Sequence, residues 1–154
     1  MSTPTAIEIT PAGVRATVKE TAAALRKALR EAFPGVKFSV RMATGTAYGW
    51  LSLSWTDGPT SAQVRKIAAN FESERFSGMD DSYHSTAVTQ WSCCGITEQR
   101  SISPDRIAEA VAMIELDTDG EAFIRRPDGS TAFPTYPHST DEQLALIYWQ
   151  RVAA

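Results

Sequence analysis

The side chains best suited to macromolecular recognition in this sequence are basic residues that accompany a tryptophan. Several of them are spaced by four, seven and four positions, which would place them along one stripe of a helix: Arg15, Lys19, Arg26 and Arg30. Cationic side chains beside an exposed aromatic ring can follow a nucleic acid backbone and stack on a base, or they can meet an acidic protein surface. The sequence therefore predicts a basic strip that binds a partner, made of Arg26, Arg30, Lys37, Arg41 and Trp50.

The alternative interpretation of this basic strip is an ordinary solvated helix face. Glu20 and Glu31 lie among the same residues and reduce the net positive charge of this helix face. The whole chain has a net charge of −3 and a pI of about 5.4, whereas dedicated nucleic-acid-binding domains usually carry a basic excess. The charge balance argues against such a domain but leaves a local basic patch open.

Residues that could bind a soft metal or act as a nucleophile are few. Adjacent cysteines on a strand point to opposite faces, so Cys93 and Cys94 do not have the spacing of a zinc site. A nucleophilic pair with His84 or His138 would need an electropositive site, and Arg100 is the nearby positive charge. The sequence predicts no catalytic residue, no metal and no cofactor, and we interpret the cysteines as small, reduced, semi-buried residues.

The acidic residues in apparent loops are interpreted as turn residues. Two pairs could ligate a hard metal, Asp80 with Asp81 and Asp117 with Asp119, but Asp is common in loops for local backbone reasons. The segment 57–59, Asp-Gly-Pro, could present an acid to a ligand. We favour a strand-to-helix turn there, because that interpretation explains each residue.

The elements that would position these side chains begin with a helix. Thr10 and Pro11 are typical of a helix start, and the apolar stripe runs to about Ala32 before Pro-Gly ends it. Residues 36–42 and 50–55 alternate between apolar and polar side chains, which predicts two paired antiparallel strands. Their polar sides would carry Lys37, Arg41 and Trp50, and their apolar sides would join one core: Val14, Val18, Leu25, Leu29, Phe38, Val40, Leu51, Leu53, Val64, Ile67 and Phe71.

The rest of the chain predicts two more strands, three more helices and a hairpin. A capping box at Thr60 and Gln63 begins a short helix. The polar segment 72–85 follows, with Phe76 and Met79 expected to anchor on the core. We expect strands at 86–92 and 96–102, a helix after Ser103, a hairpin turn at 126–129, and a last helix that begins with the capping box Ser139 and Glu142.

The predicted fold class is α+β, in the order α-β-β-α-β-β-α. A mostly antiparallel four-stranded sheet would be covered by helices on one face, with a C-terminal hairpin and helix added. The length fits a single domain over residues 10–154, divided into a core at 10–115 and an extension at 116–154. No apolar run approaches the roughly 20 residues of a membrane helix, and no secretory signal is visible, so we expect the host cytoplasm.

Four motifs carry a family resemblance over residues 14–103. They begin at Ala32 (AFPGVKFSVR), Leu53 (LSWTDGPT), Phe76 (FSGMD, with Ser77 where the pattern prefers Asp) and Arg100 (RSIS). Together they resemble one of the large polyvalent protein-associated domains, modules that recur in proteins of bacteriophages and conjugative elements. The resemblance implies a protein of a mobile element that counteracts host defence, and it implies no catalytic residues.

The predicted function is that of a small non-enzymatic binding protein of a phage or other mobile genetic element. Its partner would be a host defence protein or a nucleic acid, in a counter-defence role such as anti-restriction. Two alternatives remain open, an enzyme with a cryptic site and a structural component of a phage or conjugation apparatus. An enzyme would show a concave site that gathers His84, Cys93 or the Asp residues, and a structural protein would self-assemble.

Overall fold

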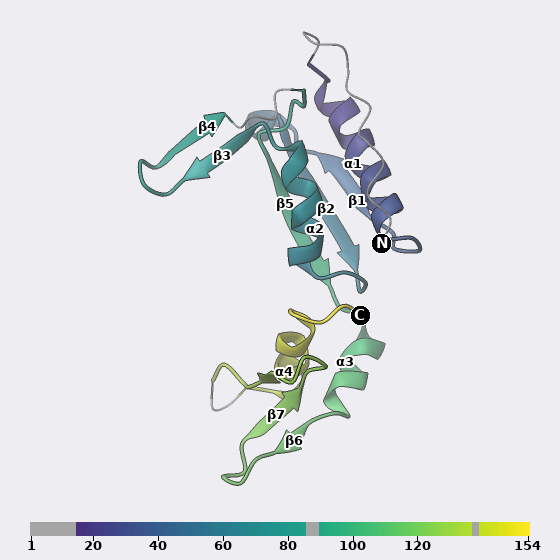
Figure 1. The fold of residues 1–154 in the computed structure, drawn as a ribbon, viewed down its shortest axis with the longest axis vertical. Helices are drawn as coiled ribbons and strands as arrows, with labels where there is room; N and C mark the ends of the chain where they lie inside the picture. The colour runs from purple at the N-terminus through teal and green to yellow at the C-terminus, as the bar shows by residue number, and fades with distance from the viewer. Residues whose placement is uncertain (1–14, 86–89, 137–138) are drawn as a thin grey trace. The chain divides into compact units, whose positions relative to one another are not determined.

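The computed structural model describes residues 15–85, 90–136 and 139–154, and it divides them into two compact units (Figure 1). Unit 1 comprises the described residues of Met1–Trp55 and Ala62–Gln99, and unit 2 comprises those of Thr56–Ser61 and Arg100–Ala154. Unit 2 is therefore built from two separate stretches of chain. That residues 10–154 form a single domain stays a prediction.

The first helix, α1 (Val18–Ala32), begins later than predicted. Thr10 and Pro11 lie outside the described residues, and Thr17 is the N-cap, with extended backbone. Its hydroxyl accepts the backbone N–H of Glu20 at 3.2 Å, and the Glu20 carboxylate accepts the backbone N–H of Thr17 at 2.7 Å. This capping box satisfies backbone groups at the helix start, which explains the late beginning. The predicted end at Ala32 is confirmed.

Unit 1 contains a three-stranded sheet in the order β1-β2-β5. β1 (Ser39–Met42) and β2 (Trp50–Thr56) pair antiparallel as predicted, with the 3-10 turn η1 (Gly45–Ala47) between them. β5 (Gly95–Ser101) pairs with β2. The predicted four-stranded sheet is wrong. The expected partner of β5, residues 86–92, lies partly outside the described residues, and positions 90–92 are not in a strand.

The predicted core of unit 1 is confirmed for its described residues. α1 and α2 (Ser61–Ala68), the latter followed by η2 (Ala69–Phe71), contribute to the same apolar cluster as the sheet. The predicted residues are buried or packed against this cluster, apart from Val14, which lies outside the described residues. Met42, the last apolar residue of the alternating segment 36–42, is 48% exposed at the last position of β1, where the strand ends in a loop.

A hairpin occupies the polar segment 72–85, for which the sequence predicted no strands. β3 (Glu74–Ser77) and β4 (Ser82–Ser85) pair antiparallel as a separate two-stranded sheet, and the ribbon projects from unit 1 (Figure 1). Met79 was predicted to anchor on the core, but it is fully exposed in the turn of this hairpin, so that prediction is wrong. The two strands pair through backbone hydrogen bonds. A polar side-chain pattern does not predict such pairing, and it does not prevent it.

Unit 2 combines two helices with a small antiparallel sheet. Its elements are α3 (Pro104–Val111), β6 (Glu115–Leu116), β7 (Ala122–Arg125), β8 (Thr131–Ala132) and α4 (Asp141–Trp149). α3 packs in the core of unit 2, so the predicted layer of helices over one sheet is not matched. The second apolar core contains Ala110, Ile124, Ala132, Leu144, Ala145, Tyr148 and Trp149.

Two local predictions in unit 2 can be checked directly. The hairpin turn at 126–129 is confirmed, because the Gly129 N–H donates to the Arg126 carbonyl at 2.9 Å and Gly129 has a φ of 84°. The capping box of α4 is shifted by one residue, since Thr140 and Gln143 form it in place of Ser139 and Glu142. The Ser139 hydroxyl instead accepts the backbone N–H of Tyr136 at 3.1 Å.

Candidate functional site

The face of the β1-β2-β5 sheet that does not carry the apolar core is lined by polar side chains. On β1 and β2 the register pairs Arg41 with Ser52, and Val40 with Leu53 on the opposite, buried face. On β5, Ile96 and Glu98 point toward the helix side, so alternation places Thr97 and Gln99 on the polar face. This polar sheet face is made of Ser39, Arg41, Ser52, Ser54, Thr97 and Gln99.

Trp50 lies on the same face as Arg41 and has structural partners there. Arg41 pairs with Ser52, so Trp50, two residues earlier, is its diagonal neighbour across the strands. The Trp50 ring covers Gly95, where a Cβ atom would lie within 2.9 Å of three ring carbons. Tyr83 meets the ring edge-on, with the ring centroids 6.1 Å apart. Packing therefore accounts for the half-buried position of Trp50.

The other members of the basic strip are distributed over α1 and the segment before β1. Arg26 donates a hydrogen bond to the carbonyl of Val40, which ties α1 to β1, a strand at the edge of the sheet. Arg30 is exposed in the last turn of α1, where a positive charge favours the helix dipole. Lys37 is exposed between Val36 and Phe38, which pack against the core, so burial alternates here as predicted, although β1 itself begins only at Ser39.

Burial removes nucleophilic character from the cysteines. Cys93 is fully buried, and its Sγ donates to the carbonyl of Gly95 at 3.3 Å. Burial raises the pKa of the Cys93 thiol to about 12, and burial also raises the pKa of Cys94. Both thiols are protonated near neutral pH, which is the opposite of an activated nucleophile.

His84 belongs to an exposed polar cluster on the β3–β4 hairpin. Its Nε2 lies 2.6 Å from the Asp80 carboxylate and 3.0 Å from the Ser82 hydroxyl. A hydrogen bond from Ser77 is the main cause that lowers the pKa of Asp80, followed by the one from His84. A catalytic triad needs the acid and the hydroxyl on opposite ring nitrogens, whereas here both contact the same one. The cluster therefore lacks the geometry of a triad.

The predicted turn role of the acidic pair Asp117 and Asp119 is supported. The Asp117 carboxylate accepts the backbone N–H groups of Asp119 at 2.9 Å and Glu121 at 2.8 Å. Within residues 15–85, 90–136 and 139–154, no three His, Cys, Asp or Glu side chains are grouped closely enough to hold a metal ion.

An ion-pair cluster that sequence reasoning missed links α2 to β5. Glu72, with its side chain 8% exposed, receives two hydrogen bonds from Arg65, at 2.7 and 2.8 Å. It also accepts the backbone N–H of Ile96 at 2.9 Å, and Arg65 reaches Glu98 at 3.3 Å. Glu72 follows α2 and η2 in a segment with no regular pattern, so spacing alone does not reveal the pair. Its bonds to protein partners indicate a structural role.

Two of the four family-like motifs meet inside unit 2. The Arg100 guanidinium donates to the carbonyls of Gly58 at 2.9 Å, Val152 at 3.1 Å and also Trp149. The Asp57 carboxylate accepts the backbone N–H of Ser103 at 2.8 Å. Asp57 and Gly58 both have positive φ, as expected of the turn interpretation. Asp57 thus supports the start of α3, and Arg100 ties the two motifs to the segment after α4.

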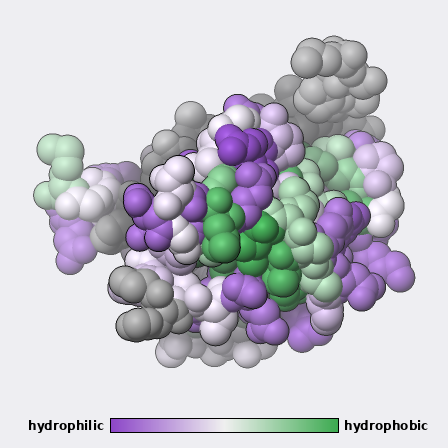
Figure 2. Space-filling view, turned by 90° about the horizontal axis from the view of Figure 1, so that it is seen from below, coloured by the Kyte–Doolittle hydropathy of each residue, from purple (hydrophilic) through white to green (hydrophobic). Residues whose placement is uncertain are grey.

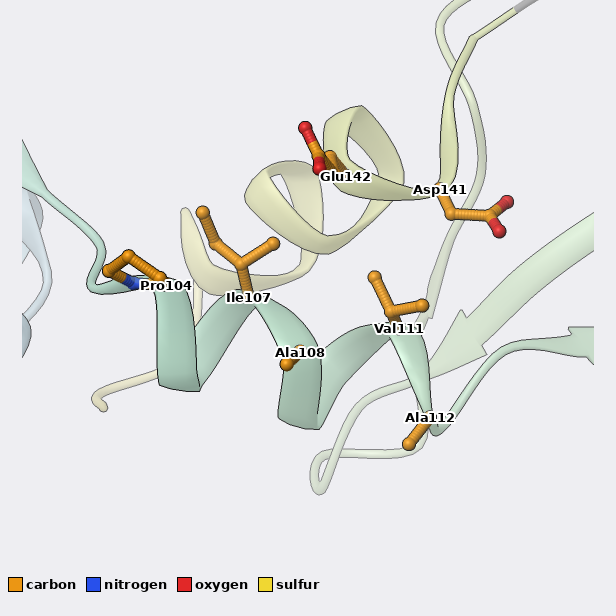
Figure 3. A pocket seen from close by; sticks show the side chains of 7 residues that line it. All are labelled: Pro104, Ile107, Ala108, Val111, Ala112, Asp141 and Glu142. Carbon is orange, nitrogen blue, oxygen red and sulfur yellow. The ribbon is translucent and has the colours of Figure 1, made fainter.

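Unit 2 also has a groove between α3 and the start of α4. Figure 2 shows that one face of the molecule carries an apolar patch flanked by hydrophilic side chains. The groove has a volume of about 730 Å³, and its lining combines an apolar floor with two acids (Figure 3). The lining residues are Pro104, Ile107, Ala108, Val111, Ala112, Asp141 and Glu142. Helical spacing alone places Ile107 and Val111 on the inner side of α3, but the sequence does not reveal how far α4 covers them.

Comparison with known proteins places the chain in a family. The family model described as large polyvalent protein associated domain 29 matches residues 16–107, which is more than half of the chain. The match includes β1 and β2, which carry Arg41 and Trp50, and it extends into α3. No curated protein and no solved structure gives a significant match. No described helix is long and apolar enough to cross a membrane. The chain belongs to the large polyvalent protein associated domain 29 family.

Proposed function

We propose that this protein is a non-enzymatic binding module of a phage or other mobile genetic element, acting in the host cytoplasm against a host defence protein. The polar sheet face, with Arg41 beside Trp50, is the observation that carries the proposal. The side of the sheet with the apolar core is occupied by helices, so this second face is the part of the sheet left for a partner.

An acidic protein surface is favoured over a nucleic acid as the partner. The unit 1 sequence has ten basic and eight acidic residues, a net charge of +2, which is a modest excess for a phosphate backbone. The Trp50 ring is already engaged by Gly95 and Tyr83, which limits its use as a platform for stacking a base. Charge complementarity with a protein surface requires neither a large basic excess nor an available aromatic ring.

The proposal is tested by affinity capture from host lysate with the wild-type chain and two charge-reversed variants. The double variant Lys37→Glu with Arg41→Glu changes the basic strip at two exposed positions. Lys27→Glu with Lys66→Glu makes the same charge change elsewhere in unit 1, also at exposed positions. We expect the first variant to lose the captured partner and the second to retain it, with both melting temperatures close to that of the wild type.

Two results would contradict the proposal. Equal capture by both variants would show that the basic strip is ordinary surface. Capture of nucleic acid in place of protein, with an affinity that falls steeply as salt rises, would identify counterion release and a nucleic-acid partner.

A further inference from the structure

The α3 side of the groove is a stripe of apolar residues at helical spacing. Pro104, Ala108 and Ala112 follow one another at intervals of four, and Ile107 and Val111 lie beside them. Both alanines are exposed, so the floor of the groove is shallow there and a second backbone can approach closely. Such a ridge-and-groove surface is the kind that receives another helix.

The charge around this stripe is negative. The unit 2 sequence has ten acidic and five basic residues, a net charge of −5. Asp141 and Glu142 stand exposed at the groove, and no ion pair within the described part of the chain involves either carboxylate (Figure 3). The positive charge of Arg106 on α3 is engaged by Glu109 at 2.7 Å and by the Trp149 ring.

We propose that this groove binds a cationic amphipathic α-helix of a partner protein. The apolar side of that helix would lie on the α3 stripe, and its Lys or Arg side chains would meet Asp141 and Glu142. The acidic rim disfavours anionic lipid and nucleic acid as occupants, because both would be repelled by the same carboxylates. This site lies in unit 2 and is separate from the basic strip.

Synthetic peptides of about 18 residues, five helical turns, test the proposal by fluorescence anisotropy with the full chain. The first peptide carries Leu on one helical face and Lys on the other. The second replaces each Lys with Glu, and the third keeps the composition of the first but spreads Leu over all faces. We expect binding of the first peptide and at least about tenfold weaker binding of the other two, because each lacks the charge or the apolar face that the groove requires.

Two variants locate the binding site. Ala108→Gln with Ala112→Gln fills the floor with polar side chains at exposed positions of α3 and its C-cap. Ala23→Gln with Ala32→Gln makes the same double change at exposed positions of α1. Asp141→Asn with Glu142→Gln removes the rim charge. Its control, Asp119→Asn with Glu121→Gln, removes the same charge from residues that do not line the groove. We expect about tenfold weaker peptide binding for the two groove variants and unchanged binding for the controls, with circular dichroism confirming the fold of each.

The contribution of the Asp141 and Glu142 carboxylates to peptide affinity should also decrease as the salt concentration is raised, because both carboxylates are exposed and therefore screened. Equal binding of the three peptides, or unchanged binding after filling the floor, would overturn the proposal. Self-association of the chain that the floor variant abolishes would overturn it as well, since the occupant would then be a second copy. None of these results bears on the basic strip, so the two proposals fail separately.

Discussion

Cys93 is a residue whose chemistry is set by its surroundings. Its thiol is fully buried, and burial raises its pKa from an ordinary value of 9.0 to about 12. Between these two values the unfolded chain loses the thiol proton while the folded chain keeps it. The free energy of unfolding therefore falls as the pH rises through this window.

The wild type should lose at most about 1.4 kcal/mol in its free energy of unfolding between pH 8 and pH 10, which is the value of one pKa unit. The loss arises because the thiol ionises in the unfolded chain over this range and stays protonated in the folded one. Urea unfolding of the wild type and of Cys93→Ala at both pH values measures it. The alanine variant removes the titration, and its packing cost is the same at both pH values. The difference in the free energy of unfolding between the wild type and Cys93→Ala should therefore become smaller as the pH rises. A constant difference would mean that the folded thiol ionises as readily as the unfolded one.

At the scale of elements, Gly95 and Trp50 show how β5 is matched to β2. The Trp50 ring occupies the space that a side chain at position 95 would need. Gly95→Ala therefore forces the ring to move, and we expect a loss of about 1–3 kcal/mol in the free energy of unfolding. Gly78→Ala is the matched control, because a Cβ there meets no atom within 4 Å. It should change stability by less than about 0.5 kcal/mol.

A double-mutant cycle separates this clash from other effects of the alanine. In a Trp50→Ala background the ring is absent, so Gly95→Ala should cost much less than it does in the wild type. Chemical denaturation of the four proteins gives the coupling energy. Additive losses would show that the two residues are not in contact, and the packing of β5 on β2 would have to be explained without the ring.

At the scale of the whole molecule, unit 2 depends on a segment that is distant in the sequence. Thr56–Ser61 belongs to this unit, and Gly58 exchanges backbone hydrogen bonds with Ala154 at 3.1 and 2.8 Å. A fragment of residues 100–154 lacks these bonds, the Gly58 acceptor of Arg100 and the Asp57 acceptor of Ser103. We expect this fragment to melt at a lower temperature and with less cooperativity than the whole chain, as measured by circular dichroism.

Adding a synthetic peptide of residues 54–62 to the fragment should raise its melting temperature, because binding to the folded state alone stabilises it. A peptide with Asp57→Asn and Gly58→Ala is the control, since alanine tolerates the positive φ of Gly58 poorly. A fragment that unfolds as the whole chain does, without any peptide, would show that residues 100–154 fold without the turn.

Local patterns in the sequence were sufficient where neighbouring residues determine the structure. The alternation in β1 and β2 predicted their pairing and the polar face with Arg41 and Trp50. The residues Arg-Pro-Asp-Gly predicted the turn between β7 and β8, because glycine at the fourth position accepts positive φ. The family-like motifs likewise predicted the family over nearly the residues that match it.

Contacts between distant segments were not predictable in the same way. β5 pairs with β2, a strand distant in the sequence, and the β3–β4 hairpin forms where side chains show no alternation. The ion pair of exposed Arg65 with buried Glu72, the bonds of Arg100 and the groove beside α3 also depend on which segments meet.

The sequence by itself determined many of the elements, most of the first core and the family, because periodicity and turn chemistry act over a few residues. Tertiary structure alone decided the division into two units and the partners of the charged side chains. Those depend on long-range packing, in which many pairings have similar local energy and only the assembled fold selects one.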